Sequence, residues 1–305
     1  MCDEPAWGPL PQDRQGQRNG AATLRSVPEL PEVESVRRQL APRLTGRRVE
    51  AVWWDPHPHA RFHAVDRLRG RRLTAVTRRG KFLLLPLDTD ARGGEHELVL
   101  HLGMTGSLRV DDDPDRGLAS TLSHVRARLD LDDGSVLLFR DPRRFGRLSV
   151  VAAGDYAQVV PTLARLGPEP LSEEFTPAVL AAGLAASRAS VKARLLDQRL
   201  VAGVGNIYAD EALWRARIHP ASRRVGPRRA ATLHAALVAV LTAAVEREGT
   251  TFRDYQMVNG QSGRYAQHLD AYGQHGRPCR RCATPLRRTV VAQRTSSYCP
   301  RCQRI

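Results

Sequence analysis

The chain has 305 residues, with 47 lysines and arginines against 32 acidic residues, and its formal net charge is +15. A chain of this length is expected to form about two globular domains, and the positive charge favours a polyanionic partner such as nucleic acid. An arginine-rich composition can also reflect a GC-rich genome, so charge alone leaves the partner open. No apolar run approaches the roughly 18 residues of a membrane span, and the start of the chain is acidic, unlike a secretory signal. We therefore expect no membrane role and a cytoplasmic protein.

The chain begins with a segment that has no structural periodicity. Residues 1–27 contain several prolines and glycines, which predicts a disordered extension. From Pro28 onward, apolar residues recur every three or four positions as far as Leu44. Pro31 lies near the start of this run and Gly46 at its end, so we predict one amphipathic helix.

Short strand-like runs follow this helix. They span residues 48–54, 81–87, 97–102, 126–131 and 135–139. The last two are joined by Asp132-Asp133-Gly134, which is typical of a hairpin turn. Because no helical run separates these strands, we predict an antiparallel β-sandwich domain over residues 28–160.

The pattern becomes helical from about Pro161. Helical runs are predicted at residues 177–186, 191–198, 207–216 and 227–248. We therefore predict an α+β chain in which a helical domain over residues 161–271 follows the sandwich and residues 272–305 form a terminal module. Gly167-Pro168-Glu169-Pro170 is a natural linker just inside the first boundary.

The terminal module carries two close pairs of cysteines. Their spacing, CxxC, sixteen residues and CxxC, suits a structural Zn²⁺ held by a β-hairpin. Four thiolates leave no open position for water, so the metal should not take part in catalysis. Arginines between the pairs should present positive charge to phosphate. The proposed ligands are Cys279, Cys282, Cys299 and Cys302.

A glycine-rich turn, Gly203-Val204-Gly205-Asn206, connects two of the predicted helices and indicates a helix-turn-helix variant. Glycines permit close backbone approach, and a helix N-terminus offers free N–H groups to an anion. Asn206 could contact phosphate or serve as an ordinary N-cap. Lys192, on the preceding helix, could add a charge at this surface or remain a solvated lysine.

Taken together, these features resemble the formamidopyrimidine-DNA glycosylase family, the bifunctional glycosylases and lyases for oxidised purines. The matching motifs run in family order over residues 28 to 302. They are Pro28-Glu29-Leu30-Pro31-Glu32-Val33-Glu34, Arg79-Gly80-Lys81-Phe82, His101-Leu102-Gly103-Met104-Thr105-Gly106, Asp141-Pro142-Arg143-Arg144-Phe145-Gly146, Leu166-Gly167-Pro168-Glu169-Pro170, Gly203-Val204-Gly205-Asn206-Ile207-Tyr208 and Ala292-Gln293-Arg294. The endonuclease VIII branch usually has glycine where Leu30 stands, so the purine-specific branch is favoured.

The resemblance implies a set of catalytic residues. Pro28 would attack C1′ of the damaged nucleotide, and Glu29 would be the general acid. Lys81, beside the lesion phosphate, and Arg294 complete the implied catalytic set. Judged only by the residues, prolines and glutamates at a helix start are usually caps.

The resemblance also implies residues that contact DNA. Met104, Arg143 and Phe145 would fill the void left by the flipped base, although Met104 and Phe145 could equally be core residues. The segment from Val258 to Tyr272 resembles the loop that closes on the extruded base. The full implied DNA-binding set is Met104, Arg143, Phe145, Lys192, Asn206 and His101.

One feature departs from the family pattern. Pro28 is internal, and an amide nitrogen has no basic lone pair with which to form an iminium. We interpret Val27 as the product of a GTG codon, so that initiation there and methionine removal would expose the amine of Pro28. Residues 1–27 would then be missing from the mature protein.

We thus predict a monomeric bacterial base-excision enzyme that binds double-stranded DNA containing an oxidised base, associates with the nucleoid and carries one structural Zn²⁺. It should excise 8-oxoguanine and formamidopyrimidines and then cut the strand by β,δ-elimination. Three alternatives stay open at this point. They are an oxidised-pyrimidine glycosylase of the same family, a non-catalytic lesion binder that keeps its extension, and a zinc-ribbon transcription factor.

Overall fold

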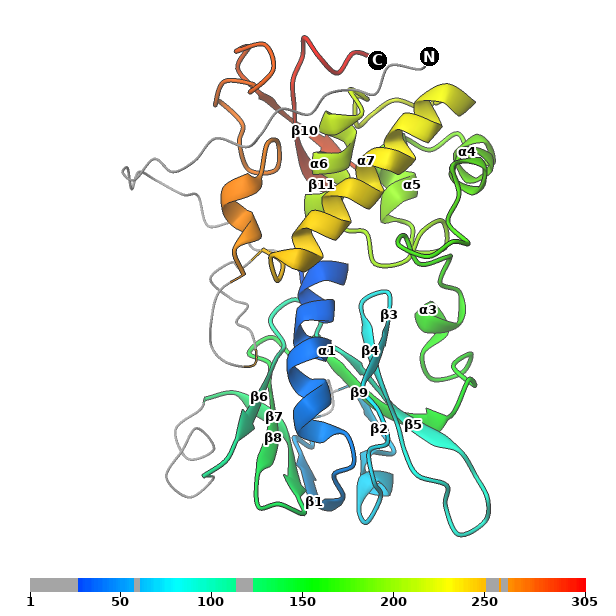
Figure 1. Ribbon diagram of the computed structural model, residues 1–305, viewed down its shortest axis with the longest axis vertical. Coiled ribbons are helices and arrows are strands. Elements are labelled where there is room, and N and C mark those ends of the chain that lie inside the picture. Colours follow the sequence, from blue (N-terminus) through cyan, green and yellow to red (C-terminus); the bar gives the residue numbers. More distant parts are fainter. Residues whose placement is uncertain (1–26, 58–60, 114–122, 251–257, 259–262) are drawn as a thin grey trace.

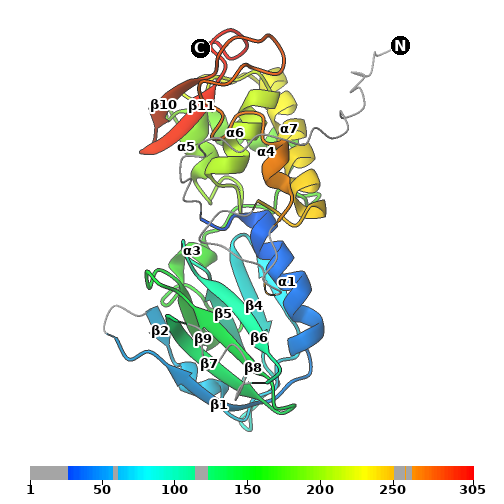
Figure 2. The same ribbon diagram turned by 90° about the vertical axis from the view of Figure 1, so that its left-hand side faces the viewer.

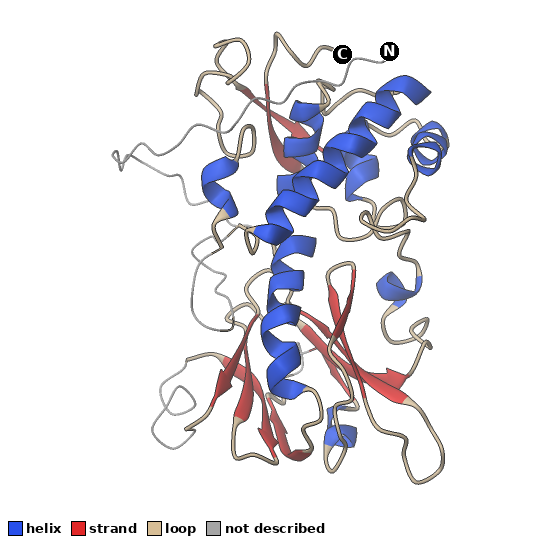
Figure 3. Ribbon diagram, in the orientation of Figure 1, coloured by secondary structure: helices blue, strands red, loops and turns tan. Residues whose placement is uncertain are grey.

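The computed structural model describes residues 27–57, 61–113, 123–250, 258 and 263–305 (Figure 1). A half built from strands and a half built from helices are stacked along the long axis, as Figure 3 shows by secondary structure. Helix α1 (Leu30–Leu44) reaches from the strand half to the junction, where it meets the end of α7 (Pro227–Glu246). The predicted extension, residues 1–27, lies outside the described residues except for Val27.

The strand half is a sandwich of two sheets, confirming the predicted fold class. The four-stranded sheet has the order β1 (Val49–Trp54), β7 (Val125–Leu131), β8 (Val136–Arg140) and β6 (Ser107–Asp111). The five-stranded sheet has the order β2 (Arg61–His63), β9 (Arg147–Ala152), β5 (His96–His101), β4 (Phe82–Pro86) and β3 (Thr77–Arg79). The prediction of a purely antiparallel sandwich is wrong at one place, because β2 pairs with β9 in parallel.

Helix α1 closes the side of the sandwich between the edge strands β3 and β6 (Figure 2). Its apolar stripe, including Val33, Val36 and Leu40, is buried in a core shared with both sheets. The helix ends as predicted, since Gly46 follows its last turn with φ +85° and a left-handed conformation suits glycine. Burying this stripe fixes the direction of the helix and so the position of its N-terminus at the junction.

The predicted hairpin of β7 and β8 is confirmed. The two strands pair antiparallel, and Gly134 in the turn has φ +82°. Asp133 closes the turn by accepting hydrogen bonds from the backbone and hydroxyl of Ser135. Strands β2, β3, β6 and β9 were missed in the sequence, and the short helix η1 (Val65–Leu68) was missed as well.

The helical half contains the four predicted helices with small shifts at their ends. They are α4 (Pro177–Ala185), α5 (Val191–Leu196), α6 (Asn206–Arg215) and α7. These helices share one apolar core with η2 (Tyr265–His268). The short α3 (Pro161–Ala164) instead packs on the sandwich through Leu163, alongside Phe82 and Val99. The boundary at residue 160 therefore remains a prediction.

The prediction that no apolar run approaches the length of a membrane span is wrong for helix α7. It has 20 residues and is long and apolar enough by composition to cross a membrane. Its apolar side chains, including Leu233, Leu237 and Leu241, are buried against α4 and α6. The core of the helical half therefore accounts for its hydrophobicity.

The C-terminal module is the predicted hairpin, formed by β10 (Arg287–Val291) and β11 (Arg294–Tyr298). Its two-residue turn places Ala292 at φ 50° and Gln293 at φ 58°. Positive φ at both positions is the geometry of a type I′ turn, whose twist matches that of paired strands. Cys279 and Leu286 of the module pack against Trp214 of α6.

Candidate active site at the domain junction

The N-terminus of α1 is held against the glycine-rich turn before α6. The backbone N–H of Leu30 donates to the carbonyl of Gly203 at 3.1 Å. Gly203 has φ +80°, and a Cβ there would lie 2.7 Å from the Cβ of Leu30. This close approach requires glycine and buries Pro28 at the junction of the two halves.

Glu29 lies at the N-terminus of α6, and its carboxylate accepts hydrogen bonds from the backbone N–H groups of Ile207 at 2.9 Å and Tyr208 at 3.4 Å. A Cβ on Gly205 would collide with this carboxyl group. Burial raises the pKa of Glu29, and the charge of Lys81 opposes that shift. The site therefore holds a carboxyl group that keeps its proton at pH values above the usual range for glutamate.

Glu32 is a second buried carboxyl group, one turn farther along α1. It accepts hydrogen bonds from the Tyr208 hydroxyl at 2.5 Å, the Thr250 N–H at 2.7 Å and the Glu29 N–H at 2.9 Å. Burial, reinforced by the charge of Glu29, raises the pKa of Glu32 to about 7. Glu32 thus ties together α1, α6 and the end of α7, and its proton is linked electrostatically to that of Glu29.

Lys81 lies in the turn between β3 and β4 and is one of only two lysines in the chain. Burial lowers its pKa, the carboxylates of Glu29 and Glu32 oppose this shift, and Arg294 adds to it. Lys81 therefore lies in the electrostatic field of both carboxyl groups. Arg294 is exposed at the start of β11.

The turn that carries Lys81 is fixed by a residue outside the predicted site set. The carboxylate of Glu169 accepts hydrogen bonds from the Gly80 N–H at 2.6 Å and from Arg78 and Arg79 at 2.8 and 3.2 Å. Glu169 belongs to the LGPEP motif, which was recognised in the sequence as a linker. The motif alone does not indicate that the Glu169 carboxylate binds the backbone N–H of Gly80.

The structure brings the three implied void-filling residues onto two adjacent loops. Met104 is half-buried between β5 and β6, whereas Arg143 and Phe145 are exposed between β8 and β9. The ring of Phe145 is 39% exposed, and the Arg143 guanidinium lies 4.5 Å from its centroid. An exposed aromatic ring paired with a cation argues against the alternative of a core residue for Phe145.

His101 lies at the end of β5 beside these loops. Its Nδ1 accepts the Gly103 N–H at 3.0 Å, and its ring contacts Phe82 at 4.7 Å between centroids. Burial, together with the positive charges of Lys81 and Arg147, lowers the pKa of His101 to about 4. The imidazole is therefore neutral at physiological pH, and with Nδ1 as acceptor its Nε2 carries the proton.

Lys192 corrects the prediction of a phosphate contact. Its side chain is completely buried, and its Nζ donates to Asp210 at 2.7 Å, to the Ser296 hydroxyl at 2.6 Å and to the Thr295 carbonyl at 3.1 Å. Burial lowers the pKa of Lys192 and raises that of Asp210, and their mutual attraction opposes both shifts. Lys192 therefore attaches the hairpin to the helical half and presents no charge to solvent.

Asn206 also faces the hairpin. The helix N-cap is Gly205, so the N-cap alternative for Asn206 is wrong by one position. The amide nitrogen of Asn206 donates to the Thr295 carbonyl at 3.1 Å. Asn206 and Lys192 thus meet the same carbonyl and fix the base of β11, the strand that carries Arg294.

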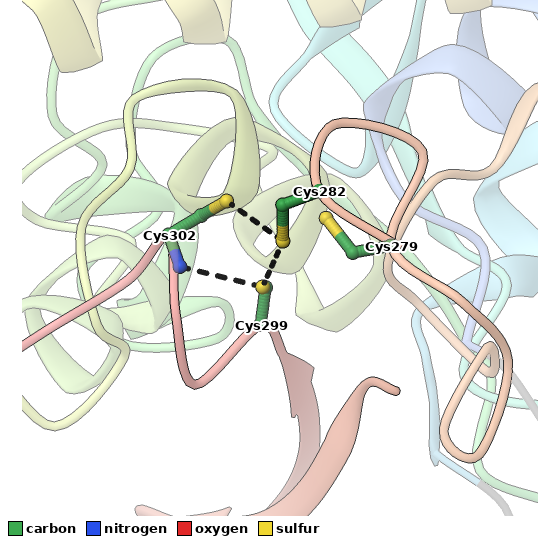
Figure 4. A group of neighbouring side chains, drawn as sticks. All are labelled: Cys279, Cys282, Cys299 and Cys302. Carbon is green, nitrogen blue, oxygen red and sulfur yellow. Dashed lines mark hydrogen bonds between the residues drawn. The ribbon is translucent and has the colours of Figure 1, made fainter. Parts of the chain in front are cut away.

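The four cysteines cluster as predicted (Figure 4). Their sulfur atoms all lie within 4.8 Å of one another, and Cys282 Sγ is 3.5 Å from the sulfurs of both Cys299 and Cys302. Tetrahedral Zn²⁺ with Zn–S bonds of about 2.3 Å separates its sulfurs by about 3.8 Å, which this cluster fits. Arg281 joins the site to α6 by stacking 4.0 Å above the ring of Trp214 and donating to its carbonyl.

Part of the predicted base-capping loop lies outside the described residues, at 259–262. Within the described part, Tyr265 and Tyr272 are buried in the helical core. Glu211, also buried, accepts the backbone N–H groups of Asp270, Ala271 and Tyr272 at 2.8–2.9 Å. The described segment from Tyr265 to Tyr272 is therefore anchored to the helical half, and the role of residues 258–272 as a loop that closes on the extruded base stays a prediction.

Family models match three consecutive parts of the chain. The formamidopyrimidine-DNA glycosylase N-terminal domain matches residues 27–148, its H2TH domain residues 166–256, and the zinc finger found in FPG and IleRS residues 276–305. The chain belongs to the formamidopyrimidine-DNA glycosylase family. The formamidopyrimidine-DNA glycosylases of Deinococcus radiodurans and Thermus thermophilus are 45% and 47% identical to it, each over 91% of this chain and 97% and 98% of their own length.

Solved glycosylase structures agree with this assignment. The MutM (Fpg) protein of Thermus thermophilus matches with a TM-score of 0.81 at 46% identity, covering 90% of this chain and 98% of that one. A Lactococcus lactis Fpg bound to DNA with an abasic site matches with 0.79 at 30%, and a MutM bound to DNA with carbocyclic 8-oxo-G matches with 0.79 at 31%. Each of these two covers 91% of this chain and 100% of its own.

Proposed function

We propose that this formamidopyrimidine-DNA glycosylase excises oxidised purines from duplex DNA as a monomer and then cuts the strand, with the amine of Pro28 as nucleophile. The observation that carries the proposal is the position of the α1 N-terminus. Pro28 and Glu29 precede the Leu30–Gly203 contact at the junction, and the charge of Lys81, distant in the sequence, acts on the carboxyl group of Glu29; these observations support the proposal.

Pro28 must be the first residue for this chemistry. As a free secondary amine with a pKa near ~8, it is substantially neutral at cellular pH. Its lone pair forms the N–C1′ bond, while the bonding pair of the glycosidic bond leaves with the base. Opening the sugar ring then gives an iminium that has no N–H proton to lose, so it can accept the electrons of the eliminations that release the 3′ and 5′ phosphates. We therefore propose that the active form begins at Pro28.

Glu29 is the proposed general acid. Its raised pKa allows it to hold a proton for the ring oxygen or the departing base, and the two N–H groups of α6 then stabilise the carboxylate that remains. Glu32 keeps Glu29 in place by accepting a hydrogen bond from the Glu29 backbone N–H, and the charge of Glu29 in turn helps to raise the pKa of Glu32. The helix start thus serves both capping and catalysis, so the two interpretations of these glutamates agree.

Lys81 and Arg294 are proposed to bind the phosphates beside the lesion. Lys81 lies in a turn whose backbone is bound by Glu169, and Arg294 begins β11, where Lys192 and Asn206 donate to the carbonyl of the next residue, Thr295. Met104, Arg143 and Phe145 are proposed to occupy the duplex after base flipping. An apolar wedge with a cation beside it can offset a flipping cost of a few kcal/mol.

The zinc module is proposed to present its exposed arginines, Arg287, Arg288 and Arg294, to DNA phosphate. Cys279, Cys282, Cys299 and Cys302 would hold the metal, which supplies folding energy to the module and no open coordination position. With bacterial relatives that act on DNA, we place the protein in the cytoplasm and propose association with the nucleoid.

Borohydride trapping tests the proposed function. The full 305-residue chain and a chain beginning at Pro28 would each be incubated with a duplex containing 8-oxoguanine and, as a control, with undamaged guanine. We expect a covalent adduct only for the shorter chain on the damaged duplex. Absence of an adduct from that chain would overturn the proposed mechanism.

A further inference from the structure

One buried carboxyl group lies between the two loops that carry the void-filling residues. Asp141 is fully buried, and the hydroxyl of Thr105 donates to its Oδ1 at 2.5 Å. Thr105 directly follows Met104 and is itself buried. Asp141 belongs to the second loop, so this hydrogen bond joins the loop of Met104 to the loop of Arg143 and Phe145.

Asp141 also sets the shape of its own loop. Its Oδ1 accepts the Arg143 N–H at 3.2 Å and its Oδ2 accepts the Gly146 N–H at 2.7 Å. These bonds fix the backbone on both sides of Phe145. The exposed residues Arg143 and Phe145 therefore belong to a turn whose backbone is hydrogen-bonded to the Asp141 carboxylate.

The loops are also packed backbone against backbone. Gly103 has φ +65°, and a Cβ there would lie 2.6 Å from the carbonyl carbon of Phe145 and 2.7 Å from the nitrogen of Gly146. Contact this close leaves no room for one loop to move toward the other. A displacement of the Phe145 loop toward Gly103 must therefore be transmitted to the loop of Met104, and the hydrogen bond from Thr105 to Asp141 opposes movement of the two loops apart.

A second acidic residue supports the far side of this assembly. Asp55 accepts Arg126 and Arg144, each at 3.0 Å, and Arg126 also donates to the backbone carbonyl of Asp141. Arg144 has φ +55°, a conformation uncommon for a residue with a side chain. Its ion pair with Asp55 helps to hold it there, and this conformation turns Arg143 and Phe145 outward on either side.

We infer that Asp141 and Thr105 are positioning residues that make Met104, Arg143 and Phe145 enter the duplex as a single rigid wedge. The inference rests on the proposed function, since it concerns how that enzyme opens its substrate. Loops that are ordered before binding lose less conformational entropy on insertion. Breaking the bond between them should therefore slow insertion while leaving the reacting groups at Pro28 untouched.

Thr105→Val tests this inference because it removes only the bond between the loops and keeps the side-chain shape. Thr105→Ser, which restores a hydroxyl, is the rescue variant. Thr74→Val is the matched control, because Thr74 also donates its hydroxyl within the same domain, to Pro86, but contacts neither loop. All would be made in the chain that begins at Pro28.

Insertion would be followed by stopped-flow fluorescence of 2-aminopurine placed opposite 8-oxoguanine, alongside single-turnover base excision. In Thr105→Val we expect both rates to fall together by about tenfold, the factor expected for a lost hydrogen bond to a charged group. Thr105→Ser and Thr74→Val should stay within twofold of the unsubstituted chain, and the thermal midpoints of all variants should agree within a few degrees.

Two results would overturn the inference. One is a Thr105→Val protein with unchanged insertion and excision rates. The other is slower excision with unchanged insertion, which would make Thr105 important for a later step. If the unsubstituted chain itself forms no borohydride adduct, the proposed function fails instead, and the fluorescence signal of insertion still reports whether the two loops act as one.

Discussion

Replacing Lys192 by methionine should detach the zinc hairpin from the helical half. Lys192 and Asp210 are 0% and 1% exposed, and the Nζ makes three hydrogen bonds, two of them to β11. Removing one partner of a buried ion pair leaves the other charge uncompensated, which costs about 3–5 kcal/mol. We expect Lys192→Met to lower the free energy of unfolding by this amount and to speed the release of Zn²⁺ to a chromogenic chelator.

A double-mutant cycle with Asp210→Asn separates the ion pair from the rest of the contact. The double variant should be less destabilised than the sum of the two single variants by about 2 kcal/mol, because neither charge is then left alone. Arg199→Met, which breaks an exposed ion pair with Asp197, should leave the urea midpoint unchanged. A Lys192→Met protein with an unchanged urea midpoint, or fully additive single variants, would refute the assignment of Lys192 as a buried tether.

Further predictions concern Gly203 at the junction, Arg294 on the hairpin and the buried carboxyl group of Glu211 on α6. Gly203→Ala should reduce the rate of base excision at least tenfold, because its Cβ would displace Leu30 and with it Pro28. Gly70→Ala is the control, since Gly70 has a similar φ of +75° but open space around it, and this variant should lose only stability. Equal excision rates in the two variants would contradict the prediction. Arg294→Ala should reduce by about 1 the slope of log Kd against log salt for duplex binding, measured by fluorescence anisotropy, and an unchanged slope would show that Arg294 does not meet phosphate. Burial raises the pKa of Glu211 to about 7, so the native state binds this proton more tightly than the unfolded chain and stability falls as pH rises from about 4.5 to about 7. Glu211→Gln should remove up to about 1.4 kcal/mol per pH unit of that decline between pH ~5.5 and ~7 in urea titrations, and parallel pH profiles for the two proteins would argue against it.

Local sequence patterns were enough to predict the long helices, the β7–β8 hairpin and the zinc ligands. Each of these is set by a short stretch of chain, such as the two CxxC pairs or the turn at Gly134. The strands β2 and β3 have only three residues each, and their pairing with β9 and β4 depends on distant segments. Short strands of this kind carry too few residues to show a period.

The site residues also divide into those that short motifs identify and those whose contacts depend on distant segments. Pro28, Glu29 and Lys81 could be named from motifs, but the grip of Glu169 on Gly80 joins positions 89 residues apart and has no local signal. The error at Lys192 has a physical cause, because a lysine among arginine-rich helices resembles a solvated charge until Asp210 and Ser296 are known to enclose it. Tertiary contacts therefore decided which charged residues are exposed and which hold the fold.

The residue that becomes covalently bonded to DNA identifies the nucleophile, which we propose to be Pro28. A chain beginning at Pro28 would be trapped with borohydride on a duplex containing 8-oxoguanine, digested, and mapped by tandem mass spectrometry. We expect the deoxyribose fragment to be attached to the nitrogen of Pro28. Attachment to Lys81, or recovery of an unmodified Pro28 peptide from an otherwise active protein, would contradict it.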